Sequence, residues 1–410
     1  MRPEPSELQE LVRDLHRQGS AWLPAGLGTR LDWGPPLQAP CTVVSCAALR
    51  GVREFNPGDF TITVAAGTPL VEVQDALGHH GQWLSVDAPW GDDDGAAAGS
   101  IGGLVARGLA GGYRQRYLGV RDQLIGLALM RADGVTARAG GKVVKNVAGY
   151  DLMRLFTGSW GSLGLITELT LRTLPRPPLR RSVCFQGGAE DLAGLSRWLL
   201  GSSLSPERID WWNGSLAAAA GLDPDPLLLI GLASVDAATL QEQVRCLQER
   251  CSLPARVLDG ASTGAWLARA RGGSGAEPAG PAPPGATATA PAWLLRLGVS
   301  PDRLASLMSA PALAGLAVDM AAGSGLGLAW SDPTGSQPVL TSSQVGALRR
   351  LCGELGGHLT VLRQPPGAGL PAWLDAPARP LIEAIKHRFD PAGQLAPGRL
   401  PGVAQSLSTV

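Results

Sequence analysis

The feature that most constrains this chain is a set of four glycine-rich segments in its first half. They read PAGLGTR (24–30), AGSIGGLVA (98–106), GGKVVKNVAGYDL (140–152) and GSWGSLGLIT (158–167). Glycine recurs in them about every third residue, and each glycine inside a helix costs about 1 kcal/mol relative to alanine. We therefore expect loops in which the backbone turns sharply or approaches a ligand closely.

Each segment alone has a structural and a functional interpretation. The 24–30 segment follows an apolar, strand-like stretch, so its backbone N–H groups can form a nest for phosphate oxygens. Thr29 and Arg30 would add a hydroxyl and a positive charge there, but the segment can equally be an ordinary turn. The 98–106 segment suits either a ligand or close packing of a helix.

Charge and cysteine content argue against several classes of protein. Lys+Arg and Asp+Glu both number 35, and a net charge of zero argues against binding to nucleic acid or to a membrane surface. The six cysteines form no CxxC pair, so we expect free thiols and neither a zinc site nor an iron–sulfur cluster. No signal peptide or run of 18 apolar residues is seen, which predicts a cytoplasmic chain with no transmembrane segment.

Hydrophobic periodicity places the regular elements. In the first part of the chain it predicts helices at 6–18 (with Ser6 as N-cap), 69–79 and 152–157, strands at 21–24, 42–45, 61–65 and 165–174, a loop entering a helix at 99–110, and a hairpin of 124–131 with 135–139. Further on it predicts helices at 189–200 and 236–251 and strands at 226–234, 293–299, 314–320 and 326–330.

The proline cluster at 175–178 marks a domain boundary, because it can continue neither a helix nor a strand ladder. We expect an α+β fold with a first domain at 1–177, a second at 178–375 and a C-terminal segment, 376–410, that returns to the first domain. The Gly/Ala/Pro/Thr-rich stretch 270–292 is expected to be a flexible insertion.

Several nucleotide-binding and hydrolase motifs are missing from the sequence. It holds no GxGxxG, Walker A or GxSxG motif. Instead, the four segments in this order resemble the FAD-binding domain of the vanillyl-alcohol-oxidase/PCMH superfamily, and most of all the FAD-binding (E) subunits of glycolate oxidase. The resemblance is dense over 20–177 and thinner over 350–400, and GGKVVKNVAGYD is its most discriminating run.

The resemblance implies a PCMH-type domain of two α/β lobes with FAD between them, followed by a cap built on an antiparallel sheet with helices on one face. It implies that the backbone of Gly26, Leu27, Gly28 and Thr29, with the adjacent Arg30, holds the pyrophosphate. It implies that Gly99, Ser100, Gly102 and Gly103 line the flavin, and that Gly161, Gly164 and Ile166 close the dinucleotide site. Relatives that bond FAD covalently carry His or Cys at the pyrophosphate loop or in the substrate domain. Residues 22–34 contain neither, so FAD is expected to be non-covalent. Ala396 stands where the family's terminal motif has asparagine.

Catalytic residues are not assigned. Related catalytic flavoproteins carry an HxH…GDGNxH signature that holds a metal, whereas the five histidines here (16, 79, 80, 358 and 387) show no HxH spacing. Asp92–Asp94 is more typical of a solvated turn than of a metal site. Lys142, Lys145, Arg114, Arg116 and Arg121 can face phosphate, an acidic substrate or solvent.

The resemblance therefore implies an auxiliary or electron-relay FAD subunit of a complex that oxidises glycolate to glyoxylate. Its expected partners are a catalytic flavin subunit and an iron–sulfur subunit, through which it can lie at the inner face of a membrane. Two alternatives stay open: a self-sufficient FAD-dependent 2-hydroxy-acid dehydrogenase, and a non-catalytic structural subunit. Trp211, Trp212 and Trp373 can serve as partner anchors or as core residues.

Overall fold

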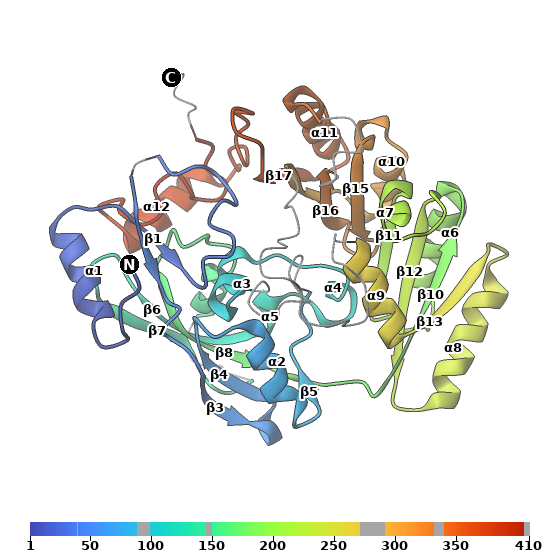
Figure 1. Ribbon diagram of the computed structural model, residues 1–410, viewed down its shortest axis with the longest axis horizontal. Coiled ribbons are helices and arrows are strands. Elements are labelled where there is room, and N and C mark those ends of the chain that lie inside the picture. Colours follow the sequence, from blue (N-terminus) through green and yellow to red (C-terminus); the bar gives the residue numbers. More distant parts are fainter. Residues whose placement is uncertain (39, 88–98, 145–149, 271–291, 332–339, 406–410) are drawn as a thin grey trace, which may run out of the picture. The chain divides into compact units, whose positions relative to one another are not determined.

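The computed structural model describes residues 1–410 apart from 39, 88–98, 145–149, 271–291, 332–339 and 406–410. The chain forms two compact units (Figure 1). Unit 1 comprises Met1–Ala110, Leu118–Arg176 and Pro371–Val410, and unit 2 comprises Gly111–Tyr117 and Pro177–Leu370. The Asp92–Asp94 turn, Lys145 and nearly all of the 270–292 insertion lie outside the described residues.

The first lobe of unit 1 is built on two short parallel strands, β1 (Trp22–Ala25) and β2 (Thr42–Ser45). Helix α1 (Leu8–Arg17) buries Leu8, Val12 and Leu15 in the core that these strands share. The predicted helix and strands are confirmed. The predicted cap at Ser6 is wrong: Glu7 occupies the N-cap position, without a capping hydrogen bond from its side chain.

The second lobe of unit 1 is a five-stranded antiparallel sheet of order β3-β4-β8-β6-β7. Its strands are β3 (Val52–Asn56), β4 (Thr61–Ala65), β6 (Leu124–Met130), β7 (Thr136–Gly140) and β8 (Leu165–Arg172). The short strands β5 (Gln82–Trp83) and β9 (Leu174–Pro175) pair separately. The predicted strands and hairpin are confirmed.

The helices of the second lobe follow from apolar spacing and capping. These elements are η1 (Pro57–Asp59), α2 (Leu70–Gly78), α3 (Ile101–Arg107), α5 (Val120–Gln123), the 3-10 turn η2 (Leu152–Phe156) and α12 (Arg379–Phe389). Helix α2 buries Leu70, Val73 and Leu77 at helical spacing. Ser100 caps α3, its hydroxyl accepting from the Gly103 N–H at 3.2 Å.

Unit 2 is an eight-stranded antiparallel sheet of order β13-β10-β12-β11-β15-β16-β14-β17. The strands are β10 (Leu179–Gln186), β11 (Arg208–Trp212), β12 (Leu227–Ser234), β13 (Ala255–Asp259), β14 (Leu294–Gly298), β15 (Leu316–Ala321), β16 (Leu326–Ser331) and β17 (His358–Arg363). The four strands predicted within this region are confirmed, and β10, β11, β13 and β17 are additional.

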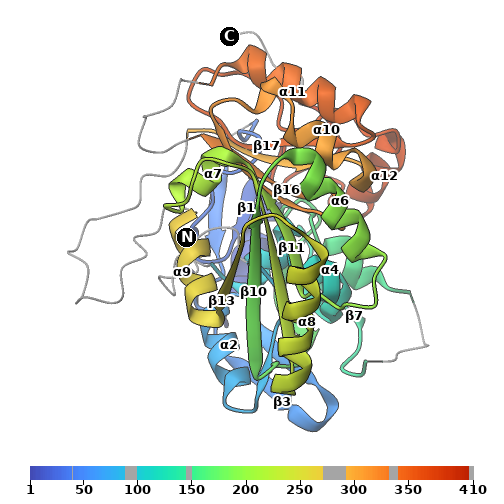
Figure 2. The same ribbon diagram turned by 90° about the vertical axis from the view of Figure 1, so that its right-hand side faces the viewer.

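Helices cover both faces of this sheet, so the expectation of helices on one face is wrong. One face carries α6 (Ala189–Leu200), α8 (Ala237–Arg250), α10 (Leu304–Met308) and α11 (Ser342–Glu354), which share a core with Trp211 (Figures 1 and 2). The alternate side chains Arg208 and Trp212 point to the other face. That face carries α7 (Gly214–Ala219), α9 (Gly260–Ala270) and α4 (Arg114–Tyr117).

The segment Gly111–Tyr117 belongs to unit 2 because its backbone packs closely against β11. A Cβ placed on Gly112 would lie 2.1 Å from Oδ1 of Asp210. Helix α4 follows at once, and Gln115 fills the space beside Gly323 in the β15–β16 turn. The predicted domain ranges contained no such excursion.

Candidate functional site

Unit 1 contains a cavity where the first, second and fourth glycine-rich segments meet. It is lined by backbone of these segments and by apolar and basic side chains. All twelve residues predicted to bind cofactor line it: Gly26, Leu27, Gly28, Thr29, Arg30, Gly99, Ser100, Gly102, Gly103, Gly161, Gly164 and Ile166. Residues that sequence reasoning missed line it too: Trp33, Ala66, Arg107, Trp160 and Arg399.

The loop after β1 takes its form from two glycines. A Cβ on Gly26 would lie 1.9 Å from the Ser100 hydroxyl, so only glycine lets this loop approach the start of α3. Gly28 has a φ of 77°, a left-handed conformation that costs glycine little. The loop therefore brings consecutive backbone groups to the cavity wall without side chains in the way.

The start of α3 is packed as closely on its other side. The N–H of Gly102 donates to the Ala66 carbonyl at 2.9 Å, and a Cβ on Gly102 would lie 2.8 Å from Ala66. Gly99, just before the capping Ser100, has a φ of 81°. The small-residue pattern at 98–106 thus serves helix packing and the cavity wall together, the two interpretations that the sequence left open.

The 158–166 loop is fixed to α3 by its backbone. The N–H of Gly158 donates to the Val105 carbonyl at 3.0 Å, and that of Trp160 to the Ala106 carbonyl at 2.9 Å. Trp160 has a φ of 55°, which is uncommon for a large side chain. Its ring packs edge-on against Trp373, with the centroids 5.7 Å apart. The tryptophan is therefore held in place at the cavity wall.

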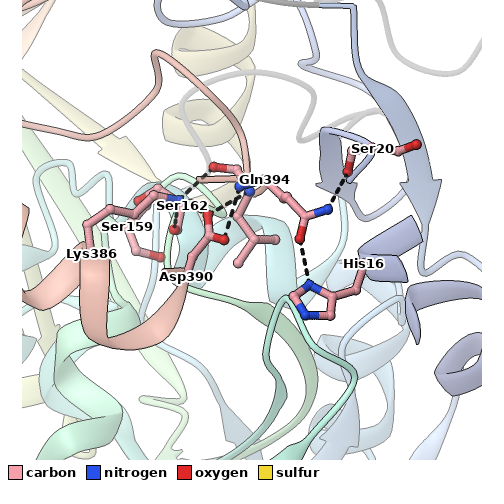
Figure 3. A network of polar contacts seen from close by, with 8 residues as sticks. His16, Ser20, Ser159, Ser162, Lys386, Asp390 and Gln394 are labelled. Atoms are coloured by element: carbon pink, nitrogen blue, oxygen red, sulfur yellow. Dashed lines mark hydrogen bonds and ion pairs between the residues drawn. The ribbon is translucent and has the colours of Figure 1, made fainter. Parts of the chain in front are cut away.

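The C-terminal segment holds the backbone of the same loop by hydrogen bonds (Figure 3). Lys386 on α12 donates its ammonium protons to the carbonyls of Ser162 at 2.7 Å and Leu395 at 2.8 Å, and to Asp390 at 2.5 Å. Asp390 is fully buried and also accepts from the N–H groups of Gln394 and Leu395. Burial lowers the pKa of Lys386, although Asp390 opposes that effect. Residues Pro371–Val410 belong to unit 1.

The network then reaches the first lobe. Oε1 of Gln394 lies 2.6 Å from Nδ1 of His16, and Nε2 of Gln394 donates to the Leu15 and Ser20 carbonyls (Figure 3). Ala396 is buried with a φ of 43°, and its N–H donates to the Trp22 carbonyl at 2.9 Å. This hydrogen bond uses only the backbone of Ala396, so it does not require the side-chain amide of the asparagine expected at this position.

The cavity fits an FAD dinucleotide in its physical features. Glycines stand where a Cβ would collide, backbone groups line two loops, and the partly buried Arg107 and the buried Arg399 lie beside it. Residues 3–140 match a family model described as an FAD binding domain. Unit 1 contains a PCMH-type FAD-binding domain. FAD is its cofactor.

Relatives of this FAD-binding domain are oxidoreductases by name. The chain is 38% identical over 180 residues to the Escherichia coli (strain K12) protein "Glycolate oxidase subunit GlcE", covering 43% of this chain and 49% of that protein. It is 37% identical over 175 residues to a D-2-hydroxyglutarate dehydrogenase of Xanthomonas citri pv. viticola, covering 42% of this chain and 35% of that enzyme. The alignments thus span half or less of these relatives, and the family is one of FAD-dependent oxidoreductases.

A solved structure extends the likeness over nearly the whole chain. An alkyldihydroxyacetonephosphate synthase superimposes with a TM-score of 0.65 at 14% identity, covering 97% of this chain and 75% of that one. At this identity the likeness concerns the fold alone, an α+β architecture that covers both units.

The other polar candidates lie elsewhere. Lys142 forms an ion pair with Glu54, and Arg154 pairs with Asp151 at 3.2 Å. The histidines lie on four elements: His16 on α1, His79 and His80 at the end of α2, His358 on β17 and His387 on α12. No group of three or more His, Cys, Asp or Glu suited to a metal occurs among the described residues. None of the helices described there is long and apolar enough to cross a membrane.

Unit 2 has a polar cluster on the α4 face of its sheet. Arg180 donates to Glu207 at 2.9 and 3.1 Å, and Arg208 donates to Asp210 at 2.5 Å. Tyr117 of α4 donates to Glu207 at 2.5 Å; burial, then this carboxylate, raises the pKa of the phenol. The guanidinium of Arg208 lies 5.1 Å from the Tyr113 ring centroid. These contacts hold the Gly111–Tyr117 segment on the sheet of unit 2.

Proposed function

We propose that this chain is the FAD-binding subunit of a glycolate oxidase complex, which oxidises glycolate to glyoxylate. The observation that carries the proposal is the cavity in unit 1: twelve residues chosen from sequence converge on it, in a domain whose named relative is a glycolate oxidase subunit. The partners proposed are a catalytic flavin subunit and an iron–sulfur subunit, in the cytoplasm or at the inner face of a membrane.

In this proposal the twelve residues hold FAD without a covalent bond. Gly26, Leu27, Gly28 and Thr29 present backbone groups to the pyrophosphate, and the α3 start and the 161–166 loop close over the rest of the cofactor. When bound, FAD supplies the acceptor for a hydride or for electrons. The protein positions the cofactor and shields it from water.

The auxiliary role is supported by the chain's own donor set. Oxidation of a 2-hydroxy acid needs a base for the substrate proton and cations for the carboxylate. The five histidines lie on four separate elements and none has HxH spacing, so the metal-binding signature of the catalytic relatives is missing from the sequence. We therefore propose that this chain relays electrons or supports the complex, and that a partner subunit performs the oxidation.

One observation in unit 2 favours a second candidate, a self-sufficient 2-hydroxy-acid dehydrogenase. Arg296 on β14 makes no hydrogen bond or ion pair with any described residue. Burial, and to a smaller extent the positive charge of Arg114, lower the pKa of Arg296. His358 on β17 lies diagonally across from Arg296 on the same sheet face. Cations without a carboxylate partner suit the carboxylate of a hydroxy acid.

Purification separates these candidates. The full chain is expressed alone and within its native complex, and flavin and iron are counted in both. The proposal predicts FAD on the isolated chain, no bleaching of its absorbance by glycolate, and bleaching with bound iron in the complex. Bleaching of the isolated chain by glycolate would defeat the subunit role in favour of the second candidate. Absence of flavin would favour a structural subunit.

A further inference from the structure

Two arginines on the cavity wall of unit 1, Arg107 partly buried and Arg399 buried, have no carboxylate partner among the described residues. Arg107 is the last residue of α3, and Arg399 lies in the C-terminal segment with 6% of its surface exposed. Both line the cavity. Neither forms an ion pair with any residue that the structure describes. This is unusual, because a buried charge is normally paired.

The contacts of these arginines are with carbonyls and aromatic rings. Arg107 donates through Nη2 to the Arg30 carbonyl, and its guanidinium carbon lies 5.2 Å from the Trp33 ring centroid and 5.0 Å from that of Trp160. Its Nη1 is buried with no acceptor among the described residues. Arg399 donates to the carbonyls of Pro35 at 2.9 Å and Leu31 at 2.8 Å.

These contacts stabilise the two cations without neutralising them. Burial, and then repulsion from Arg30 and Arg399, lower the pKa of Arg107 to about 9, so the guanidinium is charged at neutral pH. Burial also lowers the pKa of Arg399. Asp32 acts in the opposite direction on both arginines, but more weakly than burial. The described surroundings thus leave positive charge on this wall, and an anion bound nearby would relieve its cost.

We propose that Arg107 and Arg399 neutralise the diphosphate of the bound dinucleotide, adding a two-arginine anion site to the backbone nest. A diphosphate carries a negative charge on each of its phosphate groups, and guanidinium groups bind phosphate oxygens strongly. The proposal rests on the proposed function, because it requires FAD in this cavity. It assigns two residues outside the glycine-rich loops to recognition of the ligand's charge.

The test compares ligands with and without phosphate groups. Flavin is removed from the full chain, and the dissociation constants of FAD, ADP and riboflavin are measured by calorimetry for wild type, Arg107→Gln and Arg399→Gln. Losing one charge–charge contact in a partly buried site is expected to raise Kd for FAD and ADP about ten- to a hundredfold. Riboflavin, which has no phosphate, is expected to bind each variant as it binds wild type.

The matched control is Arg250→Gln in unit 2. Arg250 also stacks on a tryptophan, 5.3 Å from the Trp198 ring centroid, but is exposed. Its substitution is expected to leave all three affinities unchanged. Arg107→Lys, which keeps the charge but not the planar fork, is expected to bind FAD more tightly than Arg107→Gln, and it keeps the test usable if the glutamine variant folds poorly.

The outcomes separate this proposal from the proposed function. Equal losses of riboflavin and FAD affinity would assign the arginines to packing and overturn the anion site, as would unchanged FAD affinity in both glutamine variants. If wild type bound no FAD at all, the proposed function would fail and the anion site with it. A loss confined to FAD and ADP would support both.

Discussion

Buried and partly buried arginines are stabilised in two different ways in the two units. In unit 2, Arg180 and Arg208 are held by the carboxylates of Glu207 and Asp210. In unit 1, Arg107 and Arg399 are held by backbone carbonyls and indole rings. In unit 2 the carboxylates neutralise the arginines. In unit 1 the carbonyls and rings carry no net charge, so positive charge is left at a cavity wall.

This difference separates structural from ligand-binding roles. Burial alone would lower the pKa of Arg180, but its hydrogen bonds to Glu207 and the neighbouring groups raise it above its ordinary value. In Arg107 burial prevails, and the neighbouring arginines add to it. The carboxylate partner of Arg180 thus satisfies its charge within the fold, whereas Arg107 has only carbonyl and ring contacts beside the cavity.

The largest expected effect comes from breaking a carboxylate-paired arginine. Asp210 is only 1% exposed, and Arg208→Met removes the cation that pairs with it. The loss should lower the free energy of unfolding by about 3–5 kcal/mol. Urea unfolding of the full chain measures the loss. The double variant Arg208→Met/Asp210→Leu should recover most of it, since no buried charge is left alone. A single variant within about 1 kcal/mol of wild type would contradict the structural role.

The next effect concerns the cavity itself. Gly26→Ala places a Cβ 1.9 Å from the Ser100 hydroxyl, so the loop or the start of α3 must move. We expect a loss of FAD affinity of about 1–3 kcal/mol, measured by flavin fluorescence titration. Adding Ser100→Ala should restore part of it, because the closest atom is removed. Gly78→Ala on α2, where a Cβ meets nothing within 4 Å, is the control and should bind FAD normally.

A smaller effect on stability is expected from the carbonyl-held arginine. Arg399→Met removes the donors to the Pro35 and Leu31 carbonyls but leaves no carboxylate behind. We expect a destabilisation of about 1–2 kcal/mol in the flavin-free chain, clearly below that of Arg208→Met. Unfolding of both variants in one urea series makes the comparison. Equal losses would show that the two kinds of burial do not differ in energy.

The smallest effect is a pH dependence from His358. Burial, followed by Arg296, lowers the pKa of this histidine in the folded chain. As pH falls through about 6.5 the unfolded chain then takes up more protons than the folded chain, so stability falls. His358→Gln should therefore lose less stability than wild type between pH 7.5 and 5.5. His79→Gln, at the exposed end of α2, should follow wild type.

Local pattern predicted much of the fold. Strands such as Thr61–Ala65 and helices such as Ala189–Leu200 coincide with their predicted ranges, because apolar periodicity and turn residues act over a few positions. The second helical layer on the cap sheet was missed. Which face of β11 is buried by which helices depends on segments far apart in the sequence, including the excursion of Gly111–Tyr117 from unit 1 to unit 2.

The sequence by itself determined the glycine positions of the cavity, because glycine is required wherever the backbone approaches so closely that a Cβ would collide. The cofactor class came from the resemblance of the four segments, in their order, to a known family of FAD-binding domains. No comparable sequence signal marked the other cavity residues Arg107, Trp33, Trp160 and Arg399. Each could be an ordinary surface or core residue until the fold brought α3, two loops and the C-terminal segment to one wall. Only the tertiary structure decided that Arg107 is partly buried and Arg399 buried without a carboxylate partner, since burial and pairing depend on neighbours that are remote in the chain.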